Sequence, residues 1–179
     1  MQEAYSYYVI KAKKANLVYI DKKLLGTLEK KSRSSDIVFI NINEQRYKIE
    51  PIKVTNGCSI LITNTVTEEL TGTLKISSFV GLFPKVLFEY NNTILKWATK
   101  NLFSLHWQWK NYNTTVIEAI ENFQILKQKG VVMVSELFAD SDLLIMLGVY
   151  LRNNIRILSL KELSSYNNKK NLGINLSQS

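Results

Sequence analysis

The chain has 179 residues, of which 46% are hydrophobic and 21% charged, so it has the composition of a globular domain and is long enough to bury a core. Its single cysteine, Cys58, excludes an internal disulfide framework and a cysteine-cluster metal site. The formal net charge of +8 favours a binder of polyanions. A coding sequence biased towards A and T, which enriches Lys, Asn and Ile, explains the same charge without any binding site.

The sequence gives no sign of a targeting or membrane-spanning segment. The first residues, MQEAYSYYVI, lack the basic and apolar regions of a signal peptide. The longest apolar run, Leu143–Leu151, is far shorter than the roughly 20 residues that cross a bilayer. We therefore expect a cytoplasmic protein that is either free or bound peripherally to a membrane.

Most of the chain is predicted to be β-structure, in short segments with alternating or β-branched residues. Arg46–Glu50 is the clearest case, because Tyr47 and Ile49 point one way and the charged residues the other. Pro51 is expected to weaken or end the pairing of this strand. Asn91–Asn92 is expected to form a tight hairpin turn. The candidate strands are residues 5–12, 17–20, 24–28, 36–43, 46–50, 58–63, 71–77, 86–90, 93–99, 105–110, 114–120, 123–127 and 131–136.

One of the later segments fits two kinds of structure, and two others are predicted to form a hairpin. Residues 114–120 fit a strand but also a short helix. Residues 123–127 and 131–136 are predicted to pair as a hairpin around Gln128-Lys129-Gly130. We expect eleven or twelve strands from these thirteen candidate segments, and that number at a spacing of about 8–12 residues is typical of a barrel or a sandwich.

The stretch Ala139–Leu158 breaks the β-pattern and is predicted to be a helix. Asp140 or Ser141 can cap its start, and Asp142 adds negative charge to the first turn, where the helix dipole favours it. Leu143–Leu151 is apolar around the full circumference, which indicates burial on all sides. We expect the β-structure to enclose this helix.

The order of elements carries a family resemblance. The residues concerned are Leu25-Gly26, Gly72, His106-Trp107-Gln108-Trp109 and Asp142-Leu143-Leu144-Ile145, within the span Leu17–Ile155. In these the chain resembles the tubby-C-like superfamily, which includes tubby proteins, the plant LURP-one-related proteins and the phospholipid scramblases. The resemblance implies association with anionic phospholipid membranes or with protein partners. The phosphoinositide-binding Lys/Arg pattern of tubby does not map onto this sequence, nor does a scramblase-type cysteine cluster or acidic calcium loop.

The fold class that the resemblance implies is mainly β, with a single closed antiparallel barrel of about twelve strands around a hydrophobic C-terminal helix. We expect this tubby-like barrel to occupy residues 1–160, with the central helix at about 140–157. The remaining residues, 161–179, are expected to form a polar and poorly ordered tail.

Candidate chemical residues are few. His106 is the only histidine and alternates with tryptophans, so we expect it to face solvent or a polar rim. Trp97, Trp107 and Trp109 have strand spacing and are predicted to lie in the core, although aromatic rings can also stack on a base, a sugar or a lipid. Cys58 is expected to behave as a small buried hydrophobe.

The acidic pairs and the known motifs give no sign of catalysis. Glu68-Glu69 is assigned to a turn, and the pair Asp140 and Asp142 to the start of the helix. Phosphate-binding, dinucleotide-binding and HExxH motifs are absent from the sequence. We expect no enzyme activity, no catalytic residues, no metal and no cofactor.

Basic residues are concentrated in the first 33 positions, and this is the candidate site. A hairpin over the first strands would place Lys22-Lys23 at one tip, with Lys30–Arg33 near the opposite end beside Lys13-Lys14. Such a charge run often serves only to block aggregation of strands. The candidate anion- or lipid-binding residues are Lys13, Lys14, Lys22, Lys23, Lys30, Lys31 and Arg33.

The leading hypothesis is a non-enzymatic module that binds anionic phospholipid headgroups or a protein partner through a basic barrel rim. The alternatives are a single-stranded nucleic-acid binding protein and an enzyme of unknown chemistry. The nucleic-acid hypothesis ranks lower, because it needs basic and aromatic residues interleaved on one exposed face.

Overall fold

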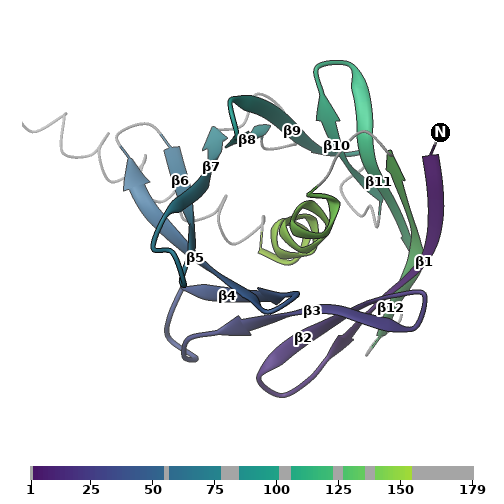
Figure 1. Cartoon of the computed structure of the whole chain (residues 1–179), viewed down its shortest axis with the longest axis horizontal. Coiled ribbons are helices and arrows are strands. Elements are labelled where there is room, and N and C mark those ends of the chain that lie inside the picture. Colours follow the sequence, from purple (N-terminus) through teal and green to yellow (C-terminus); the bar gives the residue numbers. More distant parts are fainter. Residues whose placement is uncertain are drawn as a thin grey trace, which may run out of the picture.

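The computed structural model describes residues 2–54, 57–77, 85–100, 106–122, 127–135 and 140–154. They form twelve antiparallel strands that close into a barrel, with one helix seen inside the ring of strands in the view of Figure 1. The strands are β1 (Gln2–Lys11), β2 (Ala15–Ile20), β3 (Lys23–Lys30), β4 (Val38–Ile42), β5 (Gln45–Val54), β6 (Gly57–Asn64), β7 (Leu70–Ser77), β8 (Lys85–Tyr90), β9 (Thr93–Thr99), β10 (His106–Asn111), β11 (Thr114–Asn122) and β12 (Lys127–Ser135).

Each strand pairs with its neighbours in sequence, and β1 pairs with β12 to close the barrel. The prediction of a closed barrel of about twelve strands is therefore confirmed. The tight turn at Asn91-Asn92 is also confirmed, since both residues have positive φ, 45° and 57°, as a primed hairpin turn requires. The expected polar tail over 161–179 lies outside the described residues.

The prediction that Pro51 weakens or ends the pairing is wrong on the β6 side, because β5 continues to Val54 and Pro51 pairs with Ile60 of β6. The pairing of β5 with β4 ends at Ile49, opposite Val38. Beyond that point β5 pairs only with β6 among the described residues, so the missing N–H of proline needs no partner on the β4 side.

The predicted hairpin around Gln128-Lys129-Gly130 is also wrong, because these residues lie inside the single strand β12. Gly130 is not a turn residue but marks a close approach of two strands. A Cβ atom at this position would lie 2.0 Å from the carbonyl oxygen of Ile120 on β11. Glycine in a strand interior commonly has this cause. Residues 114–120, left open between strand and helix, belong to β11.

The up-and-down order gives the barrel two distinct ends. At the end that we call the entry end, the connections are residues 21–22, 43–44, 65–69, 91–92 and 112–113. Helix 141–154 begins there, because Tyr90 Oη donates to Asp140 Oδ2 at 2.7 Å and Asn43 Nδ2 donates to Asp142 Oδ2 at 3.1 Å. The opposite, exit end has the connections 12–14 and 31–37.

Residues of the helix and inward-facing residues of the strands form one hydrophobic core cluster. Leu144, Leu147 and Val149 are at most 1% exposed, and Trp97, Trp107 and Trp109 are equally buried, which confirms the core interpretation of the tryptophans. The indole N–H of Trp109 donates to the carbonyl of Leu144 at 2.8 Å, so the core also has a directional link from barrel to helix.

A charge placed on the helix in this core should prevent folding. Leu147 is 0% exposed, so Leu147→Asp would bury an unpaired carboxylate, and we expect the variant to be insoluble or unfolded. Leu144→Asp should behave in the same way. The control is Ile94→Asp on β9, where the native side chain is 56% exposed and folding should survive. Circular dichroism and thermal unfolding are the measurements, and a folded Leu147→Asp protein would contradict this account.

Gly148 is expected to be required for packing rather than for backbone freedom. A Cβ atom there would lie 2.4 Å from the ring of Trp107. Helix propensity alone predicts that Gly148→Ala stabilises the protein by about 1 kcal/mol. Because the large indole must be displaced, we expect a net loss of about 1–3 kcal/mol in the free energy of unfolding. Urea denaturation measures the sign, and a gain in stability would contradict the close contact.

Candidate functional site

The barrel divides the seven candidate basic residues into two groups. Lys13 and Lys14 lie in the connection between β1 and β2, and Lys30, Lys31 and Arg33 lie at the end of β3 and in the following loop. Both connections belong to the exit end. All five side chains are exposed, and we call this group the basic rim.

Strand pairing places the two parts of the basic rim side by side. Ala15 pairs with Glu29, so the turn 12–14 lies next to the end of β3, which Lys30 completes. The turn is closed by Ala12 N donating to Ala15 O at 2.9 Å. The loop that carries Lys31 and Arg33 is closed by Lys31 N donating to Ile37 O at 3.0 Å.

Lys22 and Lys23 do not belong to this group, because they lie at the entry end, in the turn between β2 and β3 and at the start of β3. The turn is fixed by the carboxylate of Asp21, which accepts from both the N–H and the hydroxyl of Ser6 at 2.8 Å. Asp21 and Lys22 have φ values of 45° and 69°. The arrangement expected from the sequence, with these two lysines at the opposite tip, agrees with the observed topology.

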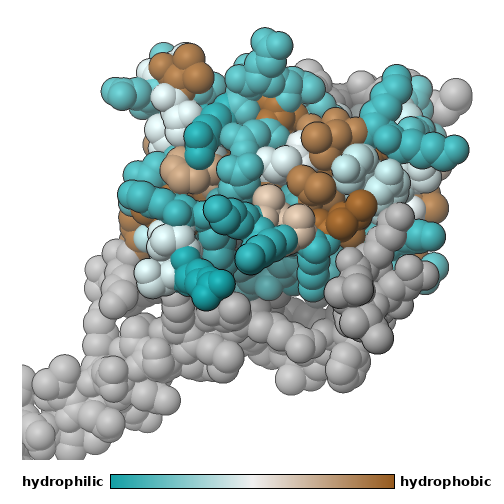
Figure 2. Space-filling model, turned by 90° about the horizontal axis from the view of Figure 1, so that it is seen from below, coloured by the Kyte–Doolittle hydropathy of each residue, from teal (hydrophilic) through white to brown (hydrophobic). Residues whose placement is uncertain are grey.

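The basic rim has few ionic partners. Among the described residues, the ion pairs between side chains involve Lys48, Lys75, Lys100, His106 and Arg152, and none involves the basic rim. The carboxylates placed at this end of the first strands are Glu29, which is half-buried, and Asp36. On the side where Figure 1 places β2 and β3, the described surface is mostly hydrophilic, with separate groups of hydrophobic residues (Figure 2).

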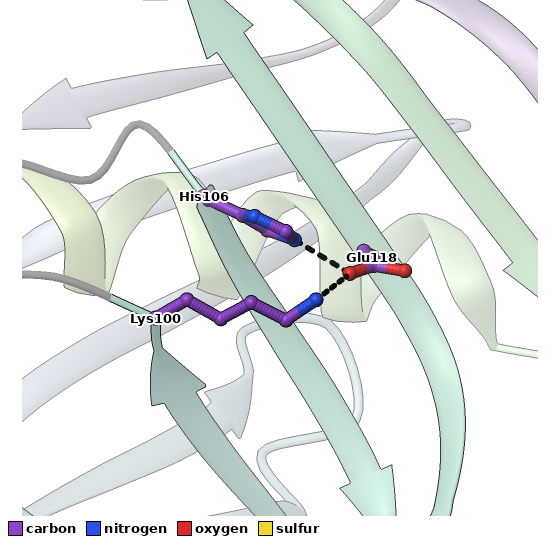
Figure 3. A network of polar contacts seen from close by, with 3 residues as sticks. All are labelled: Lys100, His106 and Glu118. Atoms are coloured by element: carbon purple, nitrogen blue, oxygen red, sulfur yellow. Dashed lines mark hydrogen bonds and ion pairs between the residues drawn. The ribbon is translucent and has the colours of Figure 1, made fainter.

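His106 is half-buried on the outer wall and does not simply face solvent. Its Nε2 lies 2.5 Å from Oε1 of Glu118, and Lys100 Nζ lies 2.8 Å from the same oxygen (Figure 3). The hydrogen bond from Lys100 and the one shared with His106 lower the pKa of Glu118, while partial burial opposes them. The imidazole of His106 and the ammonium group of Lys100 thus share one carboxylate oxygen of Glu118, which is a structural polar arrangement. The sequence did not suggest Glu118 as its partner.

A second polar network lies inside the barrel and was missed from the sequence. Glu121 on β11 is 4% exposed, and its Oε1 accepts from Tyr7 Oη at 3.0 Å and from Trp107 Nε1 at 2.9 Å. Arg152 of the helix places Nε 3.1 Å from Oε2, a charge contact without an aligned hydrogen bond. Burial, and then the charge of Glu121, raise the pKa of Tyr7 well above its usual value.

At the entry end the carboxylates of the helix start bind barrel residues. Burial, and then the hydrogen bond to Asp140, raise the pKa of Tyr90. The carboxylate of Asp142 accepts from Asn43, a turn residue with φ of 46°. These two acids were predicted to cap the helix, and their side chains also tie it to the strands β4, β5 and β8. Cys58 is half-buried at the edge of the core rather than fully buried.

The described residues contain no group of three or more His, Cys, Asp or Glu side chains that could hold a metal ion. In the same part of the chain, no helix is long and apolar enough to span a membrane. Comparison of the chain with protein-family models, with curated proteins and with solved structures gave no match. Any functional argument therefore rests on the geometry of these residues.

Removal of the Glu118 charge should lower stability in a pH-dependent way. The pKa of Glu118 is lowered in the folded protein, so the ionised carboxylate stabilises the fold. This stabilisation is complete above the unfolded pKa of about 4.3 and is lost as the pH falls through the lower pKa of the folded protein. We expect Glu118→Gln to cost about 1 kcal/mol at neutral pH and progressively less in acid. Urea denaturation at neutral and at acidic pH measures this difference in the free energy of unfolding, with Glu68→Gln in an exposed turn as the control. A difference in the free energy of unfolding that does not change with pH would contradict the ionic contact.

Proposed function

We propose that this protein is a non-enzymatic binding module that docks on anionic phospholipid headgroups through the basic rim. The observation that carries the proposal is the placement of five exposed basic side chains on two neighbouring connections at one end of the barrel. Attraction of about 1 kcal/mol per basic residue near an anionic surface makes five residues sufficient for weak, salt-dependent docking. In the cell this would hold a cytoplasmic protein peripherally at a membrane surface.

We further propose that the architecture is that of the tubby-C-like superfamily, with the barrel enclosing a hydrophobic helix. Three observations support this: the closed order of twelve strands, the burial of helix residues Leu143–Leu151, and the hydrogen bond from Trp109 to Leu144. In this architecture the helix holds the fold together, and ligand binding is left to the outer surface.

The burial of the tryptophans weighs against the alternative of single-stranded nucleic-acid binding. Such binding uses aromatic rings as stacking platforms beside basic side chains. Trp107 and Trp109 are 0% exposed and Trp97 is 1% exposed. The most exposed of the described aromatic residues, Tyr112, lies at the entry end, away from the basic rim. The enzyme hypothesis has equally little support, because the side chain of the one histidine is engaged with Glu118, whose carboxylate also binds Lys100.

Liposome sedimentation with the full chain tests the proposal. The protein is mixed with vesicles of phosphatidylcholine alone or with added phosphatidylserine or a phosphoinositide. It should sediment only with the anionic vesicles, and only at low salt. The double variant Lys30→Glu, Lys31→Glu should lose binding about tenfold or more, because each reversal replaces an attraction of about 1 kcal/mol by repulsion.

The matched control is Lys22→Glu, Lys23→Glu, which changes net charge by the same amount at the entry end. This control should bind nearly as well as the unchanged protein if the basic rim is the docking surface. Equal loss in both variants would show that binding follows net charge alone. Absence of binding to every anionic vesicle would refute docking on lipid and leave an acidic protein surface as the partner to test.

A further inference from the structure

The entry end of the barrel gathers large apolar side chains that face solvent. Five of them are 54–92% exposed, and they lie in four of the five entry-end connections or in the first two residues of the strands that follow. These five are Leu24, Val66, Leu70, Ile94 and Tyr112. The other exposed large hydrophobics of the described residues lie on the walls or at the exit end, at Val54, Ile120 and Val131. Apolar side chains gathered at one end indicate an interaction surface, whereas scattered ones do not.

Tyr112 is the clearest member of this group. It lies in the two-residue connection between β10 and β11, is 92% exposed and has a φ of 51°. A bulky side chain rarely adopts this left-handed conformation, which Gly and Asn adopt more easily. Closure of the hairpin does not require an aromatic ring, and strained backbone is concentrated at functional positions. The ring at this tip is therefore better explained by binding than by folding.

The same end carries exposed charges of both signs on separate hairpins. Lys22 and Lys23 lie at the connection between β2 and β3, and Glu68 and Glu69 lie in the connection between β6 and β7. Among the described residues, no ion pair involves any of these four side chains. The glutamates would repel an anionic surface, and the lysines would repel a polycation. The partner that fits has both signs in complementary places.

The strand order shows that a second copy of this chain meets that condition. The β4–β5 and β10–β11 connections lie six strands apart, and therefore on opposite sides of the ring of twelve strands (Figure 1). A two-fold axis through both connections, perpendicular to the barrel axis, places two copies with their entry ends face to face. The β2–β3 connection of each copy then lies opposite the β6–β7 connection of the other.

This symmetry pairs charges with charges and apolar groups with apolar groups. Lys22-Lys23 of each copy meets Glu68-Glu69 of the other, so the ionic contact forms twice. Leu24 lies opposite the connection that carries Val66. Tyr112 lies near the axis and meets its own counterpart. Complementarity of this kind is what an isologous interface requires.

We propose that the entry end is the interface of a symmetric dimer in which two copies pack end to end about this axis. A ring of twelve strands about 4.8 Å apart and tilted by about 40° has a backbone diameter of about 24 Å. Side chains widen this end to about 32 Å, an area of roughly 800 Å², which is what each partner buries in an interface of standard size. The two basic rims lie at the far ends of such a dimer, so dimerisation does not depend on docking to lipid.

Sedimentation equilibrium of the full chain, without lipid, measures the association. The unchanged protein should be a dimer that dissociates on dilution. Val66→Ser with Tyr112→Ser should weaken association about tenfold or more, because both copies lose apolar surface that the interface buries. The matched control, Ile120→Ser with Val131→Ser, removes exposed apolar side chains from the outer wall and should leave association unchanged. A protein that is monomeric at every concentration, or an equal loss in the control, would overturn the proposal.

Charge reversal tests the position of the axis. Lys22→Glu with Lys23→Glu, or Glu68→Lys with Glu69→Lys, should each weaken the dimer, because like charges then meet at both ionic contacts. An equimolar mixture of these two variants should regain association, since opposite charges face one another again in the mixed dimer. One chain with all four changes should also associate like the unchanged protein. Because misfolded variants do not recover on mixing, failure of both recoveries would refute this axis.

Discussion

The interior of a twelve-stranded barrel has to be filled, and much of this structure follows from that constraint. Eight strands leave a space that side chains alone can fill, and wider barrels leave a lumen. Here the apolar residues of helix 141–154 share one core cluster with the inward residues of the strands. Small residues occur where the fit is tightest, with Gly148 against the Trp107 ring and Gly26 against the backbone carbonyl of Asn41, near Met146. These glycines are explained by packing, because neither sits where a turn is needed.

Hydrophobic packing has no direction, so the axial position of the helix depends on polar contacts at its two ends. At the entry end, Asp140 and Asp142 bind Tyr90 and Asn43. At the exit end, Arg152 lies against Glu121, which also accepts from Tyr7 and Trp107. A slip of the helix by one turn, about 5.4 Å, would break all of these contacts together. These polar contacts, between residues far apart in sequence, therefore fix the axial position of the helix, which hydrophobic packing alone leaves undetermined.

Alternation and turn residues predicted most strands and the buried tryptophans, because these are local properties of the sequence. The expectations for Pro51 and Gly130 fail for a common reason. Whether each residue is tolerated inside a strand depends on the neighbouring strand, β4 in one case and β11 in the other. The internal network was missed because Tyr7 and Glu121 are 114 positions apart, and because the predicted strand ended at residue 120. The division of the basic residues between two ends was predictable, since it follows from hairpin geometry alone.

The pairing of β1 with β12 has a consequence for how the chain reaches this structure. Gln2 lies opposite Ser135, so the seam of the barrel joins residues 133 positions apart. During synthesis, the first strand has one unpaired edge until nearly three quarters of the chain has been made. Such an edge is a site where other chains can add, and non-local pairing of this kind is slow. Closure of the seam is therefore a late event, because the free edge of β1 is covered only once β12 has been synthesised and pairs with it.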